Sequence, residues 1–255
     1  MVDDAFFNRM KGYEAVSQHT LMRRSPVIVR VDGKNFSNLT RGMNKPFDDR
    51  MTVCMKAVAR RLAAEAQNCR IAYHQSDEVS LLLTDFRTLN SEPWFANQVQ
   101  KICSVAAASA TSAFAREFIM HFPDRAREGQ LPIFDARCFN IPREEVTNYF
   151  IWRQRDCERN SISMAAQAHF SHKELHGMNR TQMMDMLMLK KGVNWNDYDA
   201  GFKRGNVVLK EKLNDNVVNS VVRSTWVVSE APIFSQNRDF IERFLRDEED
   251  RTETM

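Results

Sequence analysis

The order of its short apolar runs constrains the fold of this chain more than any other feature. Four runs rich in β-branched and other apolar residues predict strands, and they cover residues 26–31, 69–73, 78–83 and 134–141. Helical patterns fill residues 48–67 and 93–118, between the first and second strands and between the third and fourth. This order is the ferredoxin-type βαββαβ arrangement, so we predict an α+β fold with this core and additional helices.

Additional elements are expected on both sides of this core. Residues 3–16 carry apolar side chains at helical spacing and predict an amphipathic helix. A long helix should begin at Pro142 and run to about 169. A capping box at Ser171 starts further helix up to 189, and residues 225–228 predict one more strand. We expect a single catalytic domain over residues 1–255, with a core at about 20–170, an extension at about 171–245 and a charged tail at 246–255.

Composition places the chain among ordinary globular proteins. The 36 Lys and Arg against 33 Asp and Glu give a net charge of +3, and 43% of the residues are hydrophobic. These values exclude a disordered tail protein and a collagen-like repeat. No apolar run approaches the ~20 residues of a membrane-spanning helix, and the acidic start differs from a basic secretory signal. Five cysteines without a CxxC pattern favour reduced thiols, so we expect a cytoplasmic protein that does not bind membranes.

The first candidate site is the turn that ends the first predicted strand. Asp32 stands at the end of this strand, and Gly33 follows it where the backbone must turn. A carboxylate at this place suits a hard cation such as Mg²⁺, and the peptide N–H groups after the glycine suit a phosphate. Read alone, the segment also fits an ordinary Asp-Gly turn.

The second candidate site is the pair of adjacent acids Asp77 and Glu78, between the second and third predicted strands. Neighbouring residues of a strand face opposite sides, so one acid would enter the core at a desolvation cost that a bound cation relieves. In the predicted order the first and third strands are antiparallel neighbours, which brings Asp32 and Asp77 to the same end of the sheet. Two converging carboxylates predict a two-metal site for phosphoryl transfer.

Six short motifs resemble the tRNA-histidine guanylyltransferase family, including its Thg1-like members, which are 3′-to-5′ RNA polymerases. They follow the order of the family over roughly residues 5–215 and read Arg30-Val-Asp-Gly-Lys-Asn-Phe36, Lys45-Pro-Phe-Asp48, Gln75-Ser-Asp-Glu78, Phe134-Asp-Ala-Arg137, Trp152-Arg-Gln154 with Asp156-Cys157, and Lys203-Arg-Gly205. The resemblance implies a catalytic core similar to the palm of polymerases. It also implies a homotetramer, arranged as a dimer of dimers.

The resemblance implies roles for individual residues. The matches of Asp32, Asp77 and the carbonyl of Gly33 hold two Mg²⁺ ions, and Glu78 matches a further acid that matters for catalysis. The residues that match the nucleotide site are Gly33, Lys34, Asn35, Phe36, Ser37, Lys45, Asp48, Ser76 and Lys101. Within this set, Lys45 matches a lysine that the family needs to activate the 5′ end of tRNA with ATP.

The segment after the Asp-Cys pair indicates the branch of the family. Eukaryotic members carry His-Ile-Asn-Asn there, whereas this chain reads Asp156-Cys-Glu-Arg-Asn-Ser161, as in the bacterial and archaeal branch. That branch is linked to templated repair of 5′-truncated tRNA, so we expect nucleotide addition to the 5′ end of tRNA from ATP, GTP and other nucleoside triphosphates. The alternatives are a dedicated tRNA-histidine guanylyltransferase that adds one G, a two-metal nuclease or cyclase on the same carboxylates, and a non-catalytic tRNA-binding protein.

Three further groups of side chains have competing interpretations. A phosphate track for tRNA and a solvated face explain the recurring basic residues about equally well, and the candidate RNA contacts are Arg153, Arg155, Arg159, Asn160, Lys203 and Arg204. Surface histidines explain the helical spacing of His169, His172 and His176 better than a zinc site does. His74 replaces a small residue of the family beside the acids, and the sequence suggests no role for it.

Overall fold

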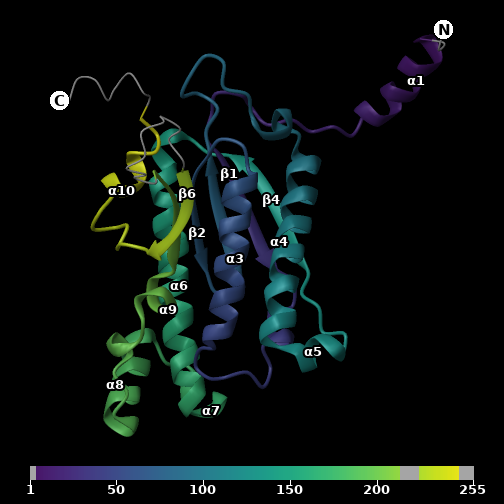
Figure 1. Ribbon diagram of the computed structural model, residues 1–255. Coiled ribbons are helices and arrows are strands. Elements are labelled where there is room, and N and C mark those ends of the chain that lie inside the picture. Colours follow the sequence, from purple (N-terminus) through teal and green to yellow (C-terminus); the bar gives the residue numbers. More distant parts are fainter. Residues whose placement is uncertain (1–3, 213–223, 247–255) are drawn as a thin grey trace, which may run out of the picture.

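The computed structural model describes residues 4–212 and 224–246. In this part of the chain the strands form one antiparallel sheet of six strands in the order β4-β1-β3-β2-β5-β6 (Figure 1). The strands are β1 (Val27–Gly33), β2 (Cys69–Gln75), β3 (Glu78–Leu83), β4 (Phe134–Asn140), β5 (Asn206–Lys212) and β6 (Ser224–Glu230). The first four form the predicted ferredoxin-type arrangement, with β1 and β3 as central neighbours, and the last two extend the sheet beyond β2.

Helices cover both faces of the sheet. They are α1 (Asp4–Ala15), α2 (Phe36–Leu39), α3 (Asp49–Glu65), α4 (Val99–His121), α5 (Pro123–Arg127), α6 (Val146–His169), α7 (His172–Leu175), α8 (Arg180–Lys191), α9 (Ala200–Arg204) and α10 (Asp239–Glu242), with the 3-10 turns η1 (Trp94–Asn97), η2 (Arg143–Glu145) and η3 (Trp195–Asp197). The pair α3 and α4 covers one face, and α6 with α10 covers the other (Figure 1). Because side chains alternate along a strand, Val29 and Val31 of β1 pack towards α3 and α4, whereas Ile28 packs towards α6.

Small residues in α4 allow it to lie close to α3. Ala106 and Ala110 are fully buried in the same cluster as Ala59 and Ala63 of α3. A separate small cluster under α8 buries Met186 and Leu187 against the second half of α6.

The structure corrects two helix boundaries and adds one strand. The helix expected from residue 93 begins at Val99, because Phe95 and Ala96 have positive φ angles of 49° and 52°, which a right-handed helix cannot contain. The helix expected from Pro142 begins at Val146, after the turn η2. Strand β5 was not predicted, although the strand expected at 225–228 lies within β6. Of the charged tail expected at 246–255, all but the first residue lies outside the described part of the chain.

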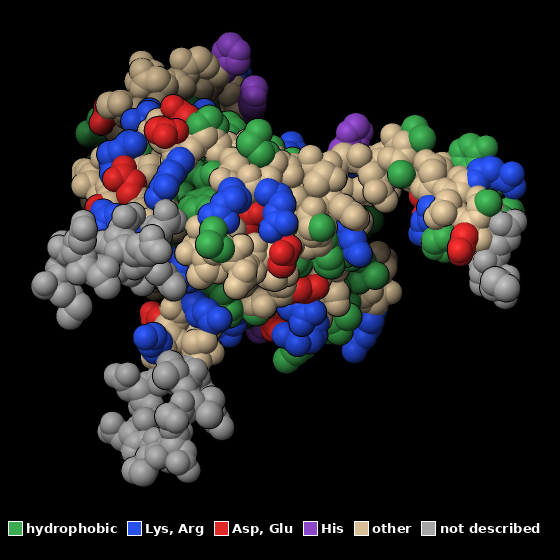
Figure 2. All heavy atoms as spheres, turned by 90° about the horizontal axis from the view of Figure 1, so that it is seen from above, with side chains coloured by type: hydrophobic (Ala, Val, Ile, Leu, Met, Phe, Trp, Pro, Cys, Tyr) green, Lys and Arg blue, Asp and Glu red, His purple; other side chains and the backbone are tan. Residues whose placement is uncertain are grey.

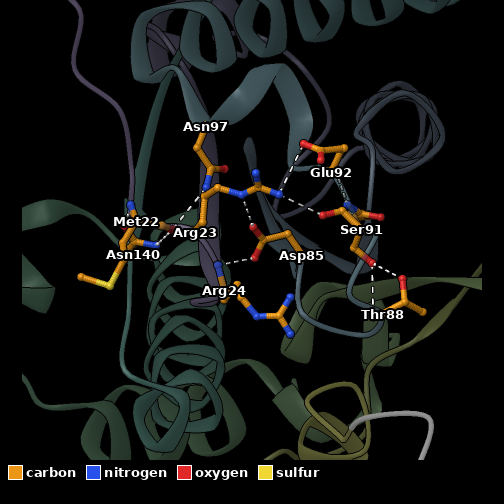
Figure 3. A network of polar contacts seen from close by, with 10 residues as sticks. Met22, Arg23, Arg24, Asp85, Thr88, Ser91, Glu92, Asn97 and Asn140 are labelled. Carbon is orange, nitrogen blue, oxygen red and sulfur yellow. Dashed lines mark hydrogen bonds and ion pairs between the residues drawn. The ribbon is translucent and has the colours of Figure 1, made fainter.

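A polar network closes the end of the sheet at which α4 begins (Figure 3). Arg23 pairs with Asp85 at 3.7 Å and with Glu92 at 3.3 Å, and the amides of Asn97 and Asn140 donate to the carbonyl of Met22 at 3.2 and 3.1 Å. Figure 2 looks onto this end and shows Lys and Arg side chains spread across it, with α1 extending away from the body. Among the described helices, none is both long and apolar enough to cross a membrane.

Candidate active site

The hairpin between β2 and β3 brings the two predicted carboxylates together. Its loop consists of Ser76 and Asp77 alone, and Ser76 adopts a positive φ of 50°. The N–H of Gly33 donates to the carbonyl of Asp77 at 3.1 Å, which fastens the hairpin tip to the end of β1. Asp32 therefore lies beside this loop, as the strand order predicted, at the end of the sheet opposite the polar network.

A row of three acids crosses the sheet at this end. Asp32 of β1 pairs in register with Asp135 of β4 on one side and with Glu78 of β3 on the other, so the three side chains share a face. Asp135 belongs to one of the six motifs, Phe134-Asp-Ala-Arg137, but no role for it was predicted. Only the register between β1 and β4 places it beside Asp32, and the order of strands alone does not give that register.

Burial and repulsion from neighbouring acids raise the pKa values of Asp32 and Asp77. Burial is the main cause of the raised pKa of Asp32, and the nearby charge of Asp135 adds to it. Burial, followed by the charge of Asp32, raises the pKa of Asp77 to about 6. A bound cation would relieve this repulsion, because it favours the charged form of both groups.

The carboxylates of Asp32 and Asp77 fit Mg²⁺ better than they fit a metal that is held by protein side chains alone. Within the described residues, no cluster of three or more His, Cys, Asp or Glu side chains is suited to a metal ion. Mg²⁺ is commonly bound by one or two carboxylates and takes its remaining ligands from water and substrate phosphates. Asp32 and Asp77 supply such a pair, and the zinc site considered for His169, His172 and His176 is not formed. All three histidines are exposed.

The turn after β1 leaves several peptide N–H groups free. Gly33 has no room for a side chain, because a Cβ atom would lie 2.3 Å from the ring of Phe36, which folds back over it. Lys34 donates its N–H to the carbonyl of Ile133 at 2.8 Å. The N–H groups of residues 35–37 have no acceptor in the described part of the chain, so they can receive a phosphate group.

A cleft of about 510 Å³ opens beside the hairpin loop. Its walls come from α2 and the loop after it, the first turn of α3, the end of β2, the second half of α6, and α9. The predicted site residues that line it are Phe36, Ser37, Lys45, Asp48, Ser76, Asp77 and Asn160. The volume is in the range of small-ligand pockets, and the cleft brings the predicted nucleotide residues and Asp77 to one place.

Two of the residues in the cleft wall are held by other parts of the protein. Asp48 caps α3 and accepts hydrogen bonds from the N–H of Asn44 and from the guanidinium of Arg50, so its carboxylate stabilises the wall of the cleft. His74 lies 3.2 Å from the amide of Asn206, and burial lowers the pKa of His74 to about 3. This histidine is therefore neutral and forms part of the inner wall.

The structure places Glu78, which was predicted as a catalytic acid, in a buried ion pair. Arg153 of α6 donates to both carboxylate oxygens, at 2.7 and 2.8 Å, and a third bond at 2.7 Å joins Arg153 to Asp156. The side chains of Glu78 and Arg153 are 6% and 8% exposed. Both carboxylate oxygens of Glu78 are therefore engaged by Arg153, next to Asp32 in the row of acids. Arg153 is also removed from the predicted RNA track, because it is buried on the opposite side of the helix from Arg155.

The structure does not bring Lys101 and Lys203 to the predicted sites. The N–H of Phe134 at the site end of β4 donates to Thr111 of α4, and Lys101 lies ten residues earlier, about 15 Å away along the helix axis. Lys203 is buried, donates to the carbonyl of Asn196 and lies 5.6 Å from the ring of Trp195. Arg155 and Arg159 remain exposed, and Arg204 is half-buried.

The half-buried carboxylate of Asp77 makes the free energy of unfolding depend on pH. Its pKa is about 6 in the folded protein against an ordinary value of 3.8, so the folded state binds this proton more tightly than the unfolded state. The free energy of unfolding should therefore fall as the pH rises from 3.8 to about 6, and the full penalty applies above that range. Asp77→Asn should raise the free energy of unfolding at neutral pH by about 1 to 2 kcal/mol, after allowance for partial exposure.

Urea unfolding of the wild type and Asp77→Asn, in acid and at neutral pH without metal, measures this effect. Asp124→Asn is the matched control, because Asp124 is an acid with an 87% exposed side chain in an ion pair with Arg127. Mg²⁺ added at neutral pH should stabilise the wild type and leave Asp77→Asn unchanged. If Asp77→Asn raised the free energy of unfolding equally in acid and at neutral pH, the charge of Asp77 would not be the cause.

Comparison with known proteins identifies the family. The family described as "Thg1: tRNAHis guanylyltransferase" matches residues 7–142, which is more than half of the chain. The tRNA(His) guanylyltransferase of Debaryomyces hansenii is 29% identical over 80% of this chain and 80% of its own length.

Solved structures extend the match over almost the whole chain. A bacterial tRNA(His) guanylyltransferase (Thg1)-like protein in complex with ATP has a TM-score of 0.85 and 41% identity, and the match covers 94% of this chain and 99% of that one. A bacterial protein of the same description in complex with GTP has a TM-score of 0.78 and 37% identity, with the same coverage. The Saccharomyces cerevisiae enzyme, at 23% identity over 80% of this chain and 92% of its own, has a TM-score of 0.67 and shares the fold.

The fold and these relatives define a nucleotidyltransferase that processes tRNA. More narrowly, the chain belongs to the tRNAHis guanylyltransferase family. The resemblance based on the six motifs and the α+β fold predicted from the order of strands and helices are thereby confirmed.

Proposed function

We propose that this protein adds nucleotides to the 5′ end of tRNA in the 3′-to-5′ direction and selects each one by pairing with the opposite strand, as repair of a 5′-truncated tRNA requires. One observation carries the proposal: Asp77, whose carboxyl is buried beside that of Asp32, lines a cleft of about 510 Å³ that also contains Ser37, Lys45 and Ser76. The bacterial relatives in complex with ATP and GTP support a nucleoside triphosphate as the occupant of this cleft.

The chemistry follows from the placement of the side chains. When the RNA begins with a 5′-monophosphate, that phosphate attacks the α-phosphate of ATP, pyrophosphate leaves, and the RNA end becomes an activated diphosphate linkage to AMP. The 3′-OH of the incoming nucleotide then attacks the 5′ phosphate of the RNA, and AMP leaves. Lys45 at the mouth of the cleft balances triphosphate charge. The free N–H groups of residues 35–37 hold phosphate oxygens.

We also propose that Asp32 and Asp77, with the carbonyl of Gly33, hold the two Mg²⁺ ions. Such ions polarise the attacked phosphate and stabilise the attacking oxygen. Arg153 pairs with Glu78 and Asp156, so this buried cation forms no ion pair with Asp32 or Asp77 in the described part of the chain. Both carboxylates therefore stay available to the ions, and the ion pair of Glu78 holds β3 next to Asp32.

The segment from Glu158 to Ser161 supports the template rule, by which each added nucleotide is selected by pairing with the opposite strand. This segment stands where eukaryotic-type members carry the His-Ile-Asn-Asn stretch, and its Asn160 and Ser161 line the cleft. Selection by base pairing needs no protein contact to base edges, because the pair itself carries the discrimination and the protein reads only backbone shape. A mismatch would misplace the attacking 3′-OH, and about 1 Å of misplacement costs roughly a hundredfold in rate.

The template rule is tested with a non-histidine tRNA that lacks its first 5′ nucleotide, with the facing nucleotide varied through all four bases. The nucleotide added should be the complement in each case. Addition of G opposite every base, or reaction of histidine tRNA alone, would contradict templated repair and would establish a dedicated guanylyltransferase in its place.

Lys45→Ala should separate activation from nucleotide addition. On 5′-monophosphate tRNA the variant should lose at least a hundredfold in kcat/KM, because binding of ATP for the activation step depends on the lysine. On 5′-triphosphate tRNA, which already carries a leaving group, the loss should stay within about tenfold. Single-turnover rates on both RNAs measure the difference, with Lys190→Ala on α8 as an exposed-lysine control. Equal losses on both RNAs would show that Lys45 acts in the nucleotide-addition step that the two RNAs share.

The homotetramer stays a prediction that α1 supports. The side chains of α1 are all exposed in the single chain, including Phe6 at 53%, Phe7 at 51% and Tyr13 at 70%, and the helix stands away from the body (Figure 1). An apolar face of this kind is stabilised when another copy covers it. Light scattering of the wild type and of a Phe6→Ser, Phe7→Ser variant measures the mass, and a monomeric wild type would contradict the prediction.

A further inference from the structure

The edge strand β4 leaves one of its faces open beside the carboxylates. The side chains of Asp135 and Arg137 on this face are 56% and 51% exposed. At the other end of β4, Phe139 is covered by α6, whose Tyr149 ring lies 6.0 Å from it. The open part of the strand is therefore the part that lies next to Asp32, and the cleft does not include it.

Trp152 of α6 stands at the border of this open face. Its side chain is 51% exposed, although tryptophan is highly buried on average. The guanidinium groups of Arg30 and Arg153 lie 6.0 and 4.3 Å from its ring centroid, and Tyr149 packs against it at 5.8 Å. The indole is thus held in place from the protein side, while about half of its surface faces solvent.

Positive charge lies between Trp152 and the catalytic end of β1. Arg30 pairs in register with Arg137, one row behind the pair of Asp32 and Asp135. Consecutive rows on one face of a sheet are about 7 Å apart. Both arginines lower the pKa of Asp32, against the burial that raises it.

The positive charge continues along α6. Trp152, Arg155 and Arg159 follow the spacing i, i+3, i+7, which places them on one side of the helix, and both arginines are exposed. An exposed indole surrounded by guanidinium groups is the combination that nucleic-acid proteins use to stack a base and hold its phosphates. A flat aromatic surface also suits a base pair at the end of a duplex.

We propose that the strip formed by Arg30, Arg137 and Trp152 docks the end of an RNA duplex, with the indole stacked on the terminal base pair and the arginines on phosphates of the strand whose 5′ end reacts. The inference rests on the proposed function, because it assigns a place to the RNA 5′ end. None of the three residues lines the cleft, so RNA and nucleoside triphosphate approach the carboxylates from different sides.

The test uses two RNA probes and needs no nucleotide. One is a labelled RNA hairpin with a recessed 5′ end, and the other is a closed RNA dumbbell of the same stem sequence, which has no free end. Fluorescence anisotropy gives the Kd of each. Trp152→Ala should weaken binding of the hairpin about tenfold, as expected for the loss of one base stack, and should change binding of the dumbbell less than twofold. Arg137→Ala should weaken both and lower the salt dependence.

Matched variants keep the test decisive. Trp152→Phe retains a ring and should keep most of the affinity for the hairpin, whereas Trp152→Leu retains apolar bulk without a ring face and should lose it. Arg127→Ala alters an ion-paired arginine outside the strip, with a side chain that is 78% exposed, and should change neither Kd. An unchanged Kd in Trp152→Ala, or an equal loss for hairpin and dumbbell, would overturn the proposal.

Failure of the docking proposal and failure of the proposed function give different results. If Trp152→Ala adds nucleotides with an unchanged KM for RNA, the docking proposal is wrong and the proposed function stands. If the wild type prefers the hairpin and loses that preference in Trp152→Ala, but adds no nucleotide, the docking proposal stands and the proposed function is wrong. The KM for the nucleoside triphosphate should stay unchanged in Trp152→Ala, which separates loss of docking from loss of fold.

Discussion

Asp77→Asn is expected to abolish nucleotide addition, with a loss of at least a thousandfold in kcat, and Asp32→Asn is expected to do the same. Each substitution keeps the shape of the side chain and removes the charge that would hold a cation at the end of β1. Loss of a metal ligand costs several kcal/mol of transition-state stabilisation, and each 1.36 kcal/mol corresponds to about tenfold in rate. Single-turnover rates with saturating RNA and nucleotide measure the loss directly.

Two controls accompany these variants. Asp135→Asn changes the third acid of the row, which is 56% exposed and paired with Arg137, and should lose less than about tenfold, since its charge only adds to the field at Asp32. Circular dichroism and urea unfolding should show that the Asp32 and Asp77 variants are folded. Turnover like that of the wild type in either folded variant would contradict the two-metal mechanism.

Arg153→Met is expected to cause the largest loss of stability of any single substitution discussed here. It leaves Glu78 buried at 6% exposure without its partner, and an uncompensated buried charge costs about 3 to 5 kcal/mol. The double variant Glu78→Gln, Arg153→Met removes both charges and should recover about 2 kcal/mol of that loss. Urea unfolding of the four proteins of this cycle gives the coupling free energy.

One outcome of this cycle would contradict the stabilising role of the ion pair between Arg153 and Glu78. If Arg153→Met unfolds with the same free energy as the wild type, within about 0.5 kcal/mol, the ion pair is not what holds α6 over β3. Arg159→Met provides the matched control, because Arg159 pairs with Asp156 on the same helix but has a 58% exposed side chain. It should change the free energy of unfolding by less than 1 kcal/mol.

The centre of the fold could be predicted because strand order follows from the sequence pattern. The run ending at Asp32 and the run starting after Asp77 are the central strands of a βαββαβ unit, so their ends had to meet. The place of Lys101 follows from the same order. β3 ends at the end of the sheet opposite Asp77, α4 begins there, and Lys101 lies in the first turn of α4.

The burial of Arg153, which was predicted as an RNA contact, could have been predicted from its spacing along the helix. Arg153 stands four residues from Tyr149 and four from Cys157, both buried, so the helical period places all three on the buried side of α6. An arginine at such a position is buried only with a paired acid, and Glu78 was the acid available in the sheet. Asp135 and the open face of β4 depend on strand register and on which face α6 covers, which no pattern in the sequence specifies.

Asp32 and Asp77 are proposed to support the addition of nucleotides at the 5′ end of RNA. The deciding measurement uses a 5′-truncated tRNA whose 3′-OH has been removed, incubated with purified protein, Mg²⁺ and labelled nucleoside triphosphate. A longer RNA that carries the label at its 5′ end should form with the wild type and not with Asp77→Asn. A product that requires the 3′-OH, or a shortened RNA as a nuclease would give, would contradict it.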